Sequence, residues 1–359
     1  MPIDVRFNRH HADDKAFHAE VKRRVDGWFT ESGVSKNANP LMWFKSVFWI
    51  GGSLACWAVV VTGVLPFPVS LVASAVLGFF IAAIGFNVGH DAIHGSYSAN
   101  QRVNNALSWS YDLIGANARN WAHGHNVVHH TWTNVPGVDG DIEAGPALRF
   151  HPHEPHRWYH RYQHFYAWLM YMGFTLRWVF LGDFVLIQKP HPNTGALEPL
   201  SGYVKLVIGK VAHFGLLLVI PMIVLPWWQG LLGFIVMHMV GGLTLAVVFQ
   251  LAHLVEGPEF PTPDADGNLE RRWAVHQLLT TANFSGGNPV VSWIVGGLDY
   301  QIEHHLFPAI CHIHYPKISP IVEQTAREFG LPYHRHDTVA KAVSSHFRLL
   351  RQLSQPSPR

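Results

Sequence analysis

Charged residues are scarce in this sequence. Asp, Glu, Lys and Arg make up 14% of its 359 residues, whereas ordinary soluble domains carry roughly 25%. Together with 48% apolar residues and a mean hydropathy of +0.10, this deficit excludes a disordered or fibrous chain and predicts that much of the surface faces lipid. The 26 basic and 24 acidic residues nearly balance, so the net charge gives no electrostatic case for nucleic acid as a partner.

Cysteine is nearly absent as well. Because Cys56 and Cys311 are the only two, the sequence excludes a disulfide framework, a zinc site of four cysteines and a cysteine-held iron–sulfur cluster. The abundant residue is histidine, with 26 copies. Imidazole is largely neutral at pH 7 and binds iron, zinc and copper well, so we expect a metal site built from histidine.

Four long runs of the sequence are apolar and carry little or no charge. They cover about 46–67, 69–89, 204–225 and 230–251, and each is long enough to span about 30 Å of hydrocarbon. Short uncharged turns join the first run to the second and the third to the fourth, which predicts two transmembrane hairpins. Lys205 and Lys210, near the start of the third run, are placed to snorkel to the interface. We expect an all-α integral membrane protein, because four buried helices of a soluble protein would need such paired runs by chance.

The positions of the basic residues predict the orientation. Eight lie in 1–45, nine in 102–210 and nine in 271–359, so neither hairpin tip carries one. By the positive-inside rule both termini and the long middle segment are cytoplasmic. The first 45 residues also lack the apolar stretch of a cleavable signal peptide. We expect a multi-pass protein of a bacterial inner membrane, with a cytosolic N-terminal segment (1–45), a membrane domain (46–315) and a cytosolic helical cap (316–359).

Shorter helices are expected outside these runs. Apolar residues at helical spacing in 12–29 predict an amphipathic helix, either on the membrane surface or packed within the cytosolic cap. The apolar segment 168–187 contains Arg177 and Asp183, which places it at the interface rather than across the bilayer. Ser319-Pro320 and Gly330 predict the start and stop of one cap helix. A second is expected over 338–353, with one apolar face formed by Val339, Val343, Phe347 and Leu350.

Histidines gather in three boxes, of which the first directly follows the second membrane run. The first box is His90-Asp91-Ala92-Ile93-His94, and its spacing of four stacks both imidazoles on one helix face. The second box is His125-Asn126-Val127-Val128-His129-His130, and the third is Gln301-Ile302-Glu303-His304-His305, while His253 directly follows the fourth run. The eight candidate ligands are His90, His94, His125, His129, His130, His253, His304 and His305. Eight ligands exceed the three or four that one zinc takes, so they indicate two metal ions.

Other histidines are interpreted as structural. This group comprises His213, His238, His276, His312 and His314, because isolated histidines are more often hydrogen-bonded core residues than ligands. The stretch His151-Pro152-His153-Glu154-Pro155-His156 is dense in histidine, but its prolines break any helix and it lacks the HExxH arrangement of a zinc protease. We interpret it as a loop.

The boxes HDAIH, HNVVHH and QIEHH, in this order around two hairpins, resemble those of the membrane-bound fatty acid desaturase family. The resemblance implies a histidine-ligated centre of two iron ions (Fe2+), with the eight histidines above as ligands. It also implies an oxygen-dependent enzyme that introduces a carbon–carbon double bond into an acyl chain. Gln301, which opens the third box, resembles the front-end subgroup, which desaturates between an existing double bond and the carboxyl end.

Two departures accompany the resemblance. Stearoyl-CoA relatives carry asparagine four residues before the counterpart of His253, where this sequence has Phe249 beside Gln250, so the ligand set around His253 stays open. The His-Pro-Gly-Gly heme motif of eukaryotic front-end enzymes, which carry a fused cytochrome b5 domain, is absent from this sequence. A separate electron donor such as a ferredoxin or a cytochrome is therefore expected, with an acyl substrate carried by CoA, acyl-carrier protein or a glycerolipid.

Residues beside the ligands offer supporting roles. Asp91, Asp141 and Glu303 are candidates to accept the N–H of a ligating imidazole, the alternatives being a helix-capping or surface carboxylate. Gln301 offers a weak oxygen ligand, a hydrogen-bond partner for a bound water or imidazole, or simple packing. Two other functions stay open at this point. A hydroxylase, acetylenase or ketolase would use the same kind of site, and a non-enzymatic heme or metal carrier would use transmembrane histidines.

Overall fold

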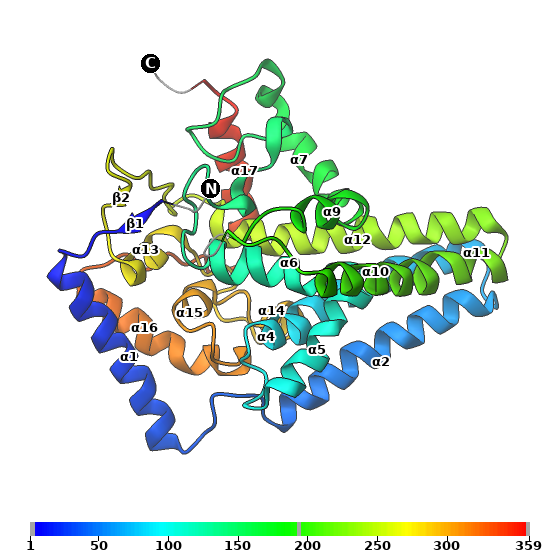
Figure 1. Ribbon diagram of the computed structural model, residues 1–359, viewed down its shortest axis with the longest axis horizontal. Coiled ribbons are helices and arrows are strands. Elements are labelled where there is room, and N and C mark those ends of the chain that lie inside the picture. The colour runs from blue at the N-terminus through cyan, green and yellow to red at the C-terminus, as the bar shows by residue number, and fades with distance from the viewer. Residues whose placement is uncertain (1–3, 192–194, 357–359) are drawn as a thin grey trace. The chain divides into compact units, whose positions relative to one another are not determined.

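The computed structural model describes residues 4–191 and 195–356, and its regular structure is almost entirely helical (Figure 1). In chain order the elements are β1 (Arg6–Phe7), α1 (Ala12–Ser32), α2 (Pro40–Thr62), α3 (Phe67–Ile84), the π-helix η1 (Gly85–Gly89), α4 (His90–Ile93), α5 (Gln101–Leu113), α6 (Ala118–Ala122), the π-helix η2 (His123–His129), the 3-10 helices η3 (Gly140–Ile142), η4 (Gly145–Ala147) and η5 (Trp158–Tyr162), α7 (Gln163–Met172), α8 (Phe174–Arg177), the π-helix η6 (Trp178–Gly182), α9 (Asp183–Leu186), α10 (Leu200–Phe214), the π-helix η7 (Gly215–Val219), α11 (Ile220–Val224), α12 (Trp227–His253), β2 (Asn268–Leu269), α13 (Trp273–Thr280), α14 (Pro289–Val295), α15 (Gln301–Leu306), the 3-10 helix η8 (His312–His314), α16 (Tyr315–Glu328) and α17 (Val339–Leu353).

The chain forms two compact units, which are described separately. Unit 1 combines the segment ending at Asn37 with His123–Ala167 and the segment beginning at Val248. Unit 2 combines Ala38–Ala122 with Trp168–Val247. In unit 1, β1 and β2 pair in parallel, with Arg6 opposite Asn268 and Phe7 opposite Leu269. This two-residue sheet is a minor departure from the expected all-helical architecture.

Four helices of the described chain are long and apolar enough to cross a membrane, which confirms the four expected spans. They run over Pro40–Thr62, Phe67–Ile93, Leu200–Val224 and Trp227–His253. The first begins six residues before the expected boundary, because Pro40 occupies its first turn and the Asn39 side chain accepts a hydrogen bond from the Met42 N–H. Large apolar side chains of this helix are exposed, as expected for residues that face lipid: the exposed fraction is 69% for Val47 and 60% for Leu54.

Close backbone approach holds the spans of unit 2 together. A Cβ atom added to Gly78 of α3 would lie 2.1 Å from the carbonyl oxygen of Met237 on α12. Only glycine therefore fits at this crossing, as is common where membrane helices meet. Leu77, Ile81 and Phe234 pack around the same crossing.

A buried polar cluster in unit 2 corrects the expected role of Lys210. This lysine does not snorkel: it is 6% exposed, and its Nζ donates to Asp183 Oδ2 and to the Gly115 carbonyl, both over 2.7 Å. The carboxylate of Asp183 thereby gains a partner that satisfies its charge.

Asp183 belongs to a bent apolar segment, in which Trp158–Met172 is followed by Phe174–Leu186 with an angle of 58° between them. This segment would be a fifth membrane span only if the two bent helices are counted as a single span.

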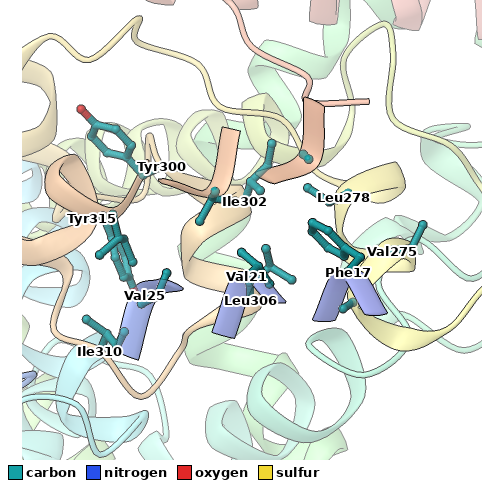
Figure 2. Packing of buried hydrophobic residues seen from close by; sticks show 14 of the residues in the cluster. Phe17, Val21, Val25, Val275, Leu278, Tyr300, Ile302, Leu306, Ile310 and Tyr315 are labelled. Atoms are coloured by element: carbon teal, nitrogen blue, oxygen red, sulfur yellow. The ribbon is translucent and has the colours of Figure 1, made fainter. Parts of the chain in front are cut away.

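Helix α1 confirms the amphipathic helix expected over 12–29, and its apolar face is covered by protein. Figure 2 shows Val21 of α1 beside Leu306 of α15, and Phe17 of the same helix face beside Val275 of α13. The same cluster takes in apolar residues of α13 and α16. The apolar face of α1 therefore packs against other helices of unit 1, which favours the packed alternative over a helix lying on the membrane surface.

The two C-terminal helices differ in detail from expectation. Helix α16 begins at Tyr315, not at Ser319-Pro320, because Pro316 already starts its first turn and the helix continues through Pro320. It ends at Glu328, close to Gly330, whose φ of 66° breaks the helix as expected.

Helix α17 has the expected bounds but buries a different face. Its buried residues are Ala342, Ser345, His346, Leu349, Leu350 and Leu353, so only Leu350 of the expected face is among them. Two hydrogen bonds explain why α17 turns this face inward. His346 Nδ1 donates to the Leu254 carbonyl over 2.6 Å, and Ser345 Oγ accepts the Glu256 N–H over 2.9 Å.

Candidate metal centre

The second histidine box lies on the π-helix η2, although its spacing of four is also that of an α-helical face. The N–H of His130 donates to the carbonyl of His125, five residues earlier, over 3.0 Å. In a π-helix, residues four and five apart flank the same face, so His129 and His130 both stand beside His125. The rings of His125 and His129 stack 5.1 Å apart, and His130 meets His125 edge-on at 4.7 Å.

Three histidines from distant segments of unit 1 converge at one point. They are His129 of η2, His253 at the end of α12 and His305 of α15, and one ring nitrogen from each lies within 4.8 Å of the others. All three side chains are buried. Their rings lie 4.6 to 4.9 Å apart between centroids.

The Nδ1 atoms of these three histidines are all occupied by acceptors. His129 Nδ1 lies 2.9 Å from Asp139 Oδ2, His253 Nδ1 lies 3.2 Å from the Thr280 carbonyl oxygen, and His305 Nδ1 lies 2.8 Å from Gln277 Oε1. Such outer bonds hold the proton on Nδ1 and leave the Nε2 lone pair for a metal.

The buried Nε2 atoms of His129 and His253 have no hydrogen-bond partner within residues 4–191 and 195–356. Buried polar atoms are rarely left unsatisfied, so such an atom calls for an explanation. Two imidazole nitrogens with their protons held on the far side of each ring form a donor set suited to Fe, Zn or Cu. These histidines therefore fit a metal ion.

A second group in unit 1 consists of His125, His130 and His304. The Nε2 atoms of His125 and His130 lie 3.2 Å apart. Two nitrogen ligands at about 2.1 Å from one ion, separated by an angle of about 100°, have this spacing. The ring of His304 lies 4.5 Å from that of His130, and its Nδ1 lies 3.2 Å from the Tyr315 hydroxyl.

The first box belongs to unit 2. His90 begins α4, directly after the π-helix η1, and the His94 N–H donates to the His90 carbonyl over 3.0 Å, in line with the expected helical spacing. Their rings lie 4.7 Å apart, and Trp121 packs against both. Gly89, just before the box, must be glycine because a Cβ atom there would lie 2.1 Å from the ring of Tyr111.

The carboxylate closest to His129 Nδ1 is that of Asp139, at 2.9 Å, a residue that the sequence pattern did not predict. Asp141 lies farther from His129 Nδ1, at 3.5 Å, and its side chain is half exposed. Burial lowers the pKa of His129, but the charges of Asp139 and Asp141 and the hydrogen bond to Asp139 outweigh burial and raise it to about 9. A metal ion that binds Nε2 of His129 must therefore displace a proton from that atom. The same pairing keeps the pKa of Asp139 below its usual value, although burial acts in the opposite direction.

Glu303 and Asp91 are both buried. The Glu303 carboxylate accepts bonds from Asn283 Nδ2 over 2.9 Å and from the Tyr333 hydroxyl over 2.7 Å. The Glu303 carboxylate thus faces an amide and a phenol rather than an imidazole. Burial raises the pKa of Glu303 to about 7, although these two hydrogen bonds act to lower it. Asp91 Oδ1 lies 3.8 Å from His90 Nδ1, beyond hydrogen-bond distance.

Gln301 is also buried, as the first residue of α15. Phe249 packs edge-on against His125 at 6.1 Å and therefore offers no ligand atom at the position of the missing asparagine. Gln277 of α13, like Asp139, was missed because its link to a ligand comes from folding, and no spacing in the sequence signals it.

Four of the histidines interpreted as structural have hydrogen bonds in keeping with that interpretation. In unit 2, His213 Nδ1 bonds the Leu113 carbonyl over 3.0 Å and His238 Nδ1 lies 3.1 Å from Thr175 Oγ1. In unit 1, His276 Nε2 bonds the Thr133 carbonyl over 2.9 Å and His314 Nε2 bonds the Asn37 carbonyl over 3.0 Å. The stretch 151–156 forms turns and irregular structure, which confirms the expected loop.

Comparison with known proteins adds an independent line of evidence. A family model described as fatty acid desaturase matches residues 65–337. The sn-1 linoleoyl-lipid 6-desaturase of Synechocystis sp. is 36% identical over 352 residues, covering 96% of this chain and 97% of that protein. The enzyme of the same name from Arthrospira platensis is 36% identical over 347 residues, covering 94% and 92%. The acyl-lipid (8-3)-desaturase of Physcomitrium patens is 35% identical over 353 residues, covering 95% and 72%. The chain therefore belongs to the fatty acid desaturase family.

Proposed function

We propose that this acyl desaturase of the front-end type holds two iron ions (Fe2+) through its eight box and α12 histidines. The ligands are His90, His94, His125, His129, His130, His253, His304 and His305. The observation that carries the proposal is the pair of buried, unsatisfied Nε2 atoms of His129 and His253, whose Nδ1 atoms are each held by an acceptor. Bound iron supplies the O2-dependent oxidation of an unactivated methylene, which has no pKa accessible to a side-chain base.

The protein's own contribution is to orient the ligands and to keep the centre dry. Asp139 and Gln277 each hold one imidazole by its Nδ1 atom. The ligands His125, His129, His130, His304 and His305 are all buried, which restricts the access of bulk water. Exclusion of water protects an oxidising site from side reactions.

The proposed substrate is an acyl chain esterified to a membrane glycerolipid. The relatives named linoleoyl-lipid and acyl-lipid desaturases support this choice over acyl-CoA and acyl-carrier protein. Expression in a host fed defined unsaturated fatty acids, followed by mass spectrometry of each lipid class, tests it. We expect a new double bond between the existing one and the carboxyl end, appearing first in glycerolipids. A hydroxy, keto or acetylenic product would contradict the proposed reaction.

The proposed topology places both termini in the cytosol of a bacterial inner membrane. It rests on the absence of basic residues near Phe67 and Trp227, the two hairpin tips. The division into segments 1–45, 46–315 and 316–359 follows from it. Labelling single cysteines in intact cells tests it: a cysteine at Trp227 should react from outside, and reaction of a cysteine at Gly140 from outside would overturn the orientation.

The proposed electron source is a separate ferredoxin or cytochrome that docks on the face rich in Lys and Arg. Confinement of the basic residues to three segments supports an electrostatic encounter with an acidic carrier. Purified protein should turn over only when such a carrier and its reductase are added, at a rate that falls with rising salt. Turnover with NADPH and oxygen alone would contradict this proposal.

A further inference from the structure

Gln277 lies in the middle of α13 and is fully buried. Its Oε1 atom lies 2.8 Å from His305 Nδ1 and 2.8 Å from Thr133 Oγ1. Its Nε2 atom faces the carbonyl oxygen of Thr131 at 3.4 Å. One amide therefore touches both the third box and the segment that follows the second.

These contacts determine which way the amide points. The Thr131 carbonyl can only accept, so it selects the NH2 end of Gln277 and leaves Oε1 toward His305. An amide oxygen can only accept as well, so it holds the proton of His305 on Nδ1. The lone pair of His305 Nε2 is then left on the side of His129 and His253, whose ring nitrogens lie within 4.8 Å.

Neighbouring residues of α13 fix the position of the Gln277 side chain. Trp273 Nε1 donates to the His130 carbonyl over 2.9 Å, and His276 Nε2 bonds the Thr133 carbonyl over 2.9 Å. Val275 and Leu278 belong to the apolar cluster in which α1 and α15 meet (Figure 2). Hydrogen bonds thus attach α13 to the last residue of box two and to the segment after it, and apolar packing attaches α13 to box three.

We propose that Gln277 is a positioning residue that orients His305 and couples it to the end of box two. The proposal rests on the proposed iron site. A second buried glutamine in unit 1 shows what a purely structural role looks like. Within the described residues, the side chain of Gln163 bonds backbone groups alone, namely the N–H and carbonyl of Arg149 and the carbonyl of Leu350. Gln277, in contrast, bonds the imidazole of a ligand.

The test compares Gln277→Leu with Gln277→Glu, and Gln163→Leu serves as the matched control. All variants are reconstituted with 57Fe, and the release of iron to a chelator is followed. Removing an outer partner of a ligand typically costs about 10- to 100-fold in metal affinity, so Gln277→Leu should lose iron about that much more readily. Gln277→Glu keeps an acceptor at Nδ1, so it should retain iron with a changed Mössbauer spectrum. Gln163→Leu should lower the melting temperature and release iron as wild type does.

Several outcomes would overturn the proposal. Iron release from Gln277→Leu at the wild-type rate would do so, and so would an equal acceleration in Gln163→Leu, because the effect would then be general destabilisation. If Gln277→Leu fails to fold, Gln277→Glu still decides the matter: an unchanged Mössbauer spectrum would contradict the proposal. Wild-type protein that binds no iron would instead refute the proposed function, so the two failures are distinguishable.

Discussion

His129 Nδ1 and Asp139 Oδ2 lie 2.9 Å apart in a fully buried contact. Asp139 also accepts the N–H groups of Asn134, over 2.8 Å, and Asp141, over 3.0 Å. The same carboxylate therefore orients a ligand and holds the loop after box two. Loss of this carboxylate should therefore disturb both the ligand and the loop.

Asp139→Asn should weaken iron binding by about 10- to 100-fold, because an amide is a poorer partner for an imidazole N–H than a carboxylate. The matched control is Asp141→Asn, since Asp141 is half exposed and lies 3.5 Å from the same Nδ1. Chelator competition on folded protein measures both. Equal losses in the two variants would show that the local negative charge matters and the hydrogen bond of Asp139 does not.

Alanine at His94, His129 or His305 should abolish turnover and lower the iron content of folded protein. The control is His160→Ala, which removes a buried histidine whose ring bonds the Pro146 carbonyl, over 3.0 Å, and the Arg157 N–H, over 3.1 Å. That variant should keep its iron. Metal analysis, with circular dichroism to confirm folding, separates ligand loss from instability. Full activity in any of the three ligand variants would remove that residue from the ligand set.

Gln301→Ala should keep most of the iron yet lose most of the activity. The side chain is buried at the start of the helix that carries His304 and His305, and residues three and four apart share a helix face. A neutral amide is a weaker donor than imidazole, so its loss should alter oxygen activation more than metal binding. Gln301→His should not exceed the wild-type rate. Single-turnover kinetics with iron analysis provide the measurement, and a wild-type rate in Gln301→Ala would reduce Gln301 to packing.

Asp14 links α1 to the start of α13 and should make unit 1 sensitive to acid. Its carboxylate accepts bonds from Arg271 Nη2 over 2.6 Å and from the Arg272 N–H over 2.9 Å. Burial raises the pKa of Asp14, but these bonds outweigh burial and lower it below its ordinary value. The stabilisation is therefore present above the unfolded-state pKa of about 3.9 and is lost as the pH falls through the lower folded-state pKa.

Asp14→Asn should accordingly lower the free energy of unfolding by roughly 1.5–3 kcal/mol at pH 7. Thermal unfolding in detergent measures the effect, with the exposed neighbour variant Asp13→Asn as control. The difference between wild type and Asp14→Asn should shrink once the pH falls below about 4. A difference that stays constant from pH 7 to pH 3 would assign the effect to packing instead of charge.

The spans and the boxes were predictable from the sequence because both depend on local pattern. Apolar length identifies a membrane helix, and a spacing of four identifies two residues on one helical face. Residues that act through long-range contacts were not predictable. Gln277 is 28 positions from His305, and Lys210 meets Asp183 only because α9 and α10 approach each other. The buried face of α17 likewise depends on Leu254 and Glu256, which are remote in sequence.

The π-helix of box two makes the number of residues between its rings as important as the rings themselves. In an α-helix, positions five apart point about 140° away from each other, whereas the His130 N–H to His125 carbonyl bond of η2 brings both rings to one side. Deleting Val127 would leave all three histidines in the chain but would shorten the separation of His125 and His130 from five residues to four. An α-helical turn would then present these two rings on one face, in place of the present arrangement of three rings. A designer who transplants this motif must therefore carry over its length and its widened helical turn, since histidine count alone does not encode the site.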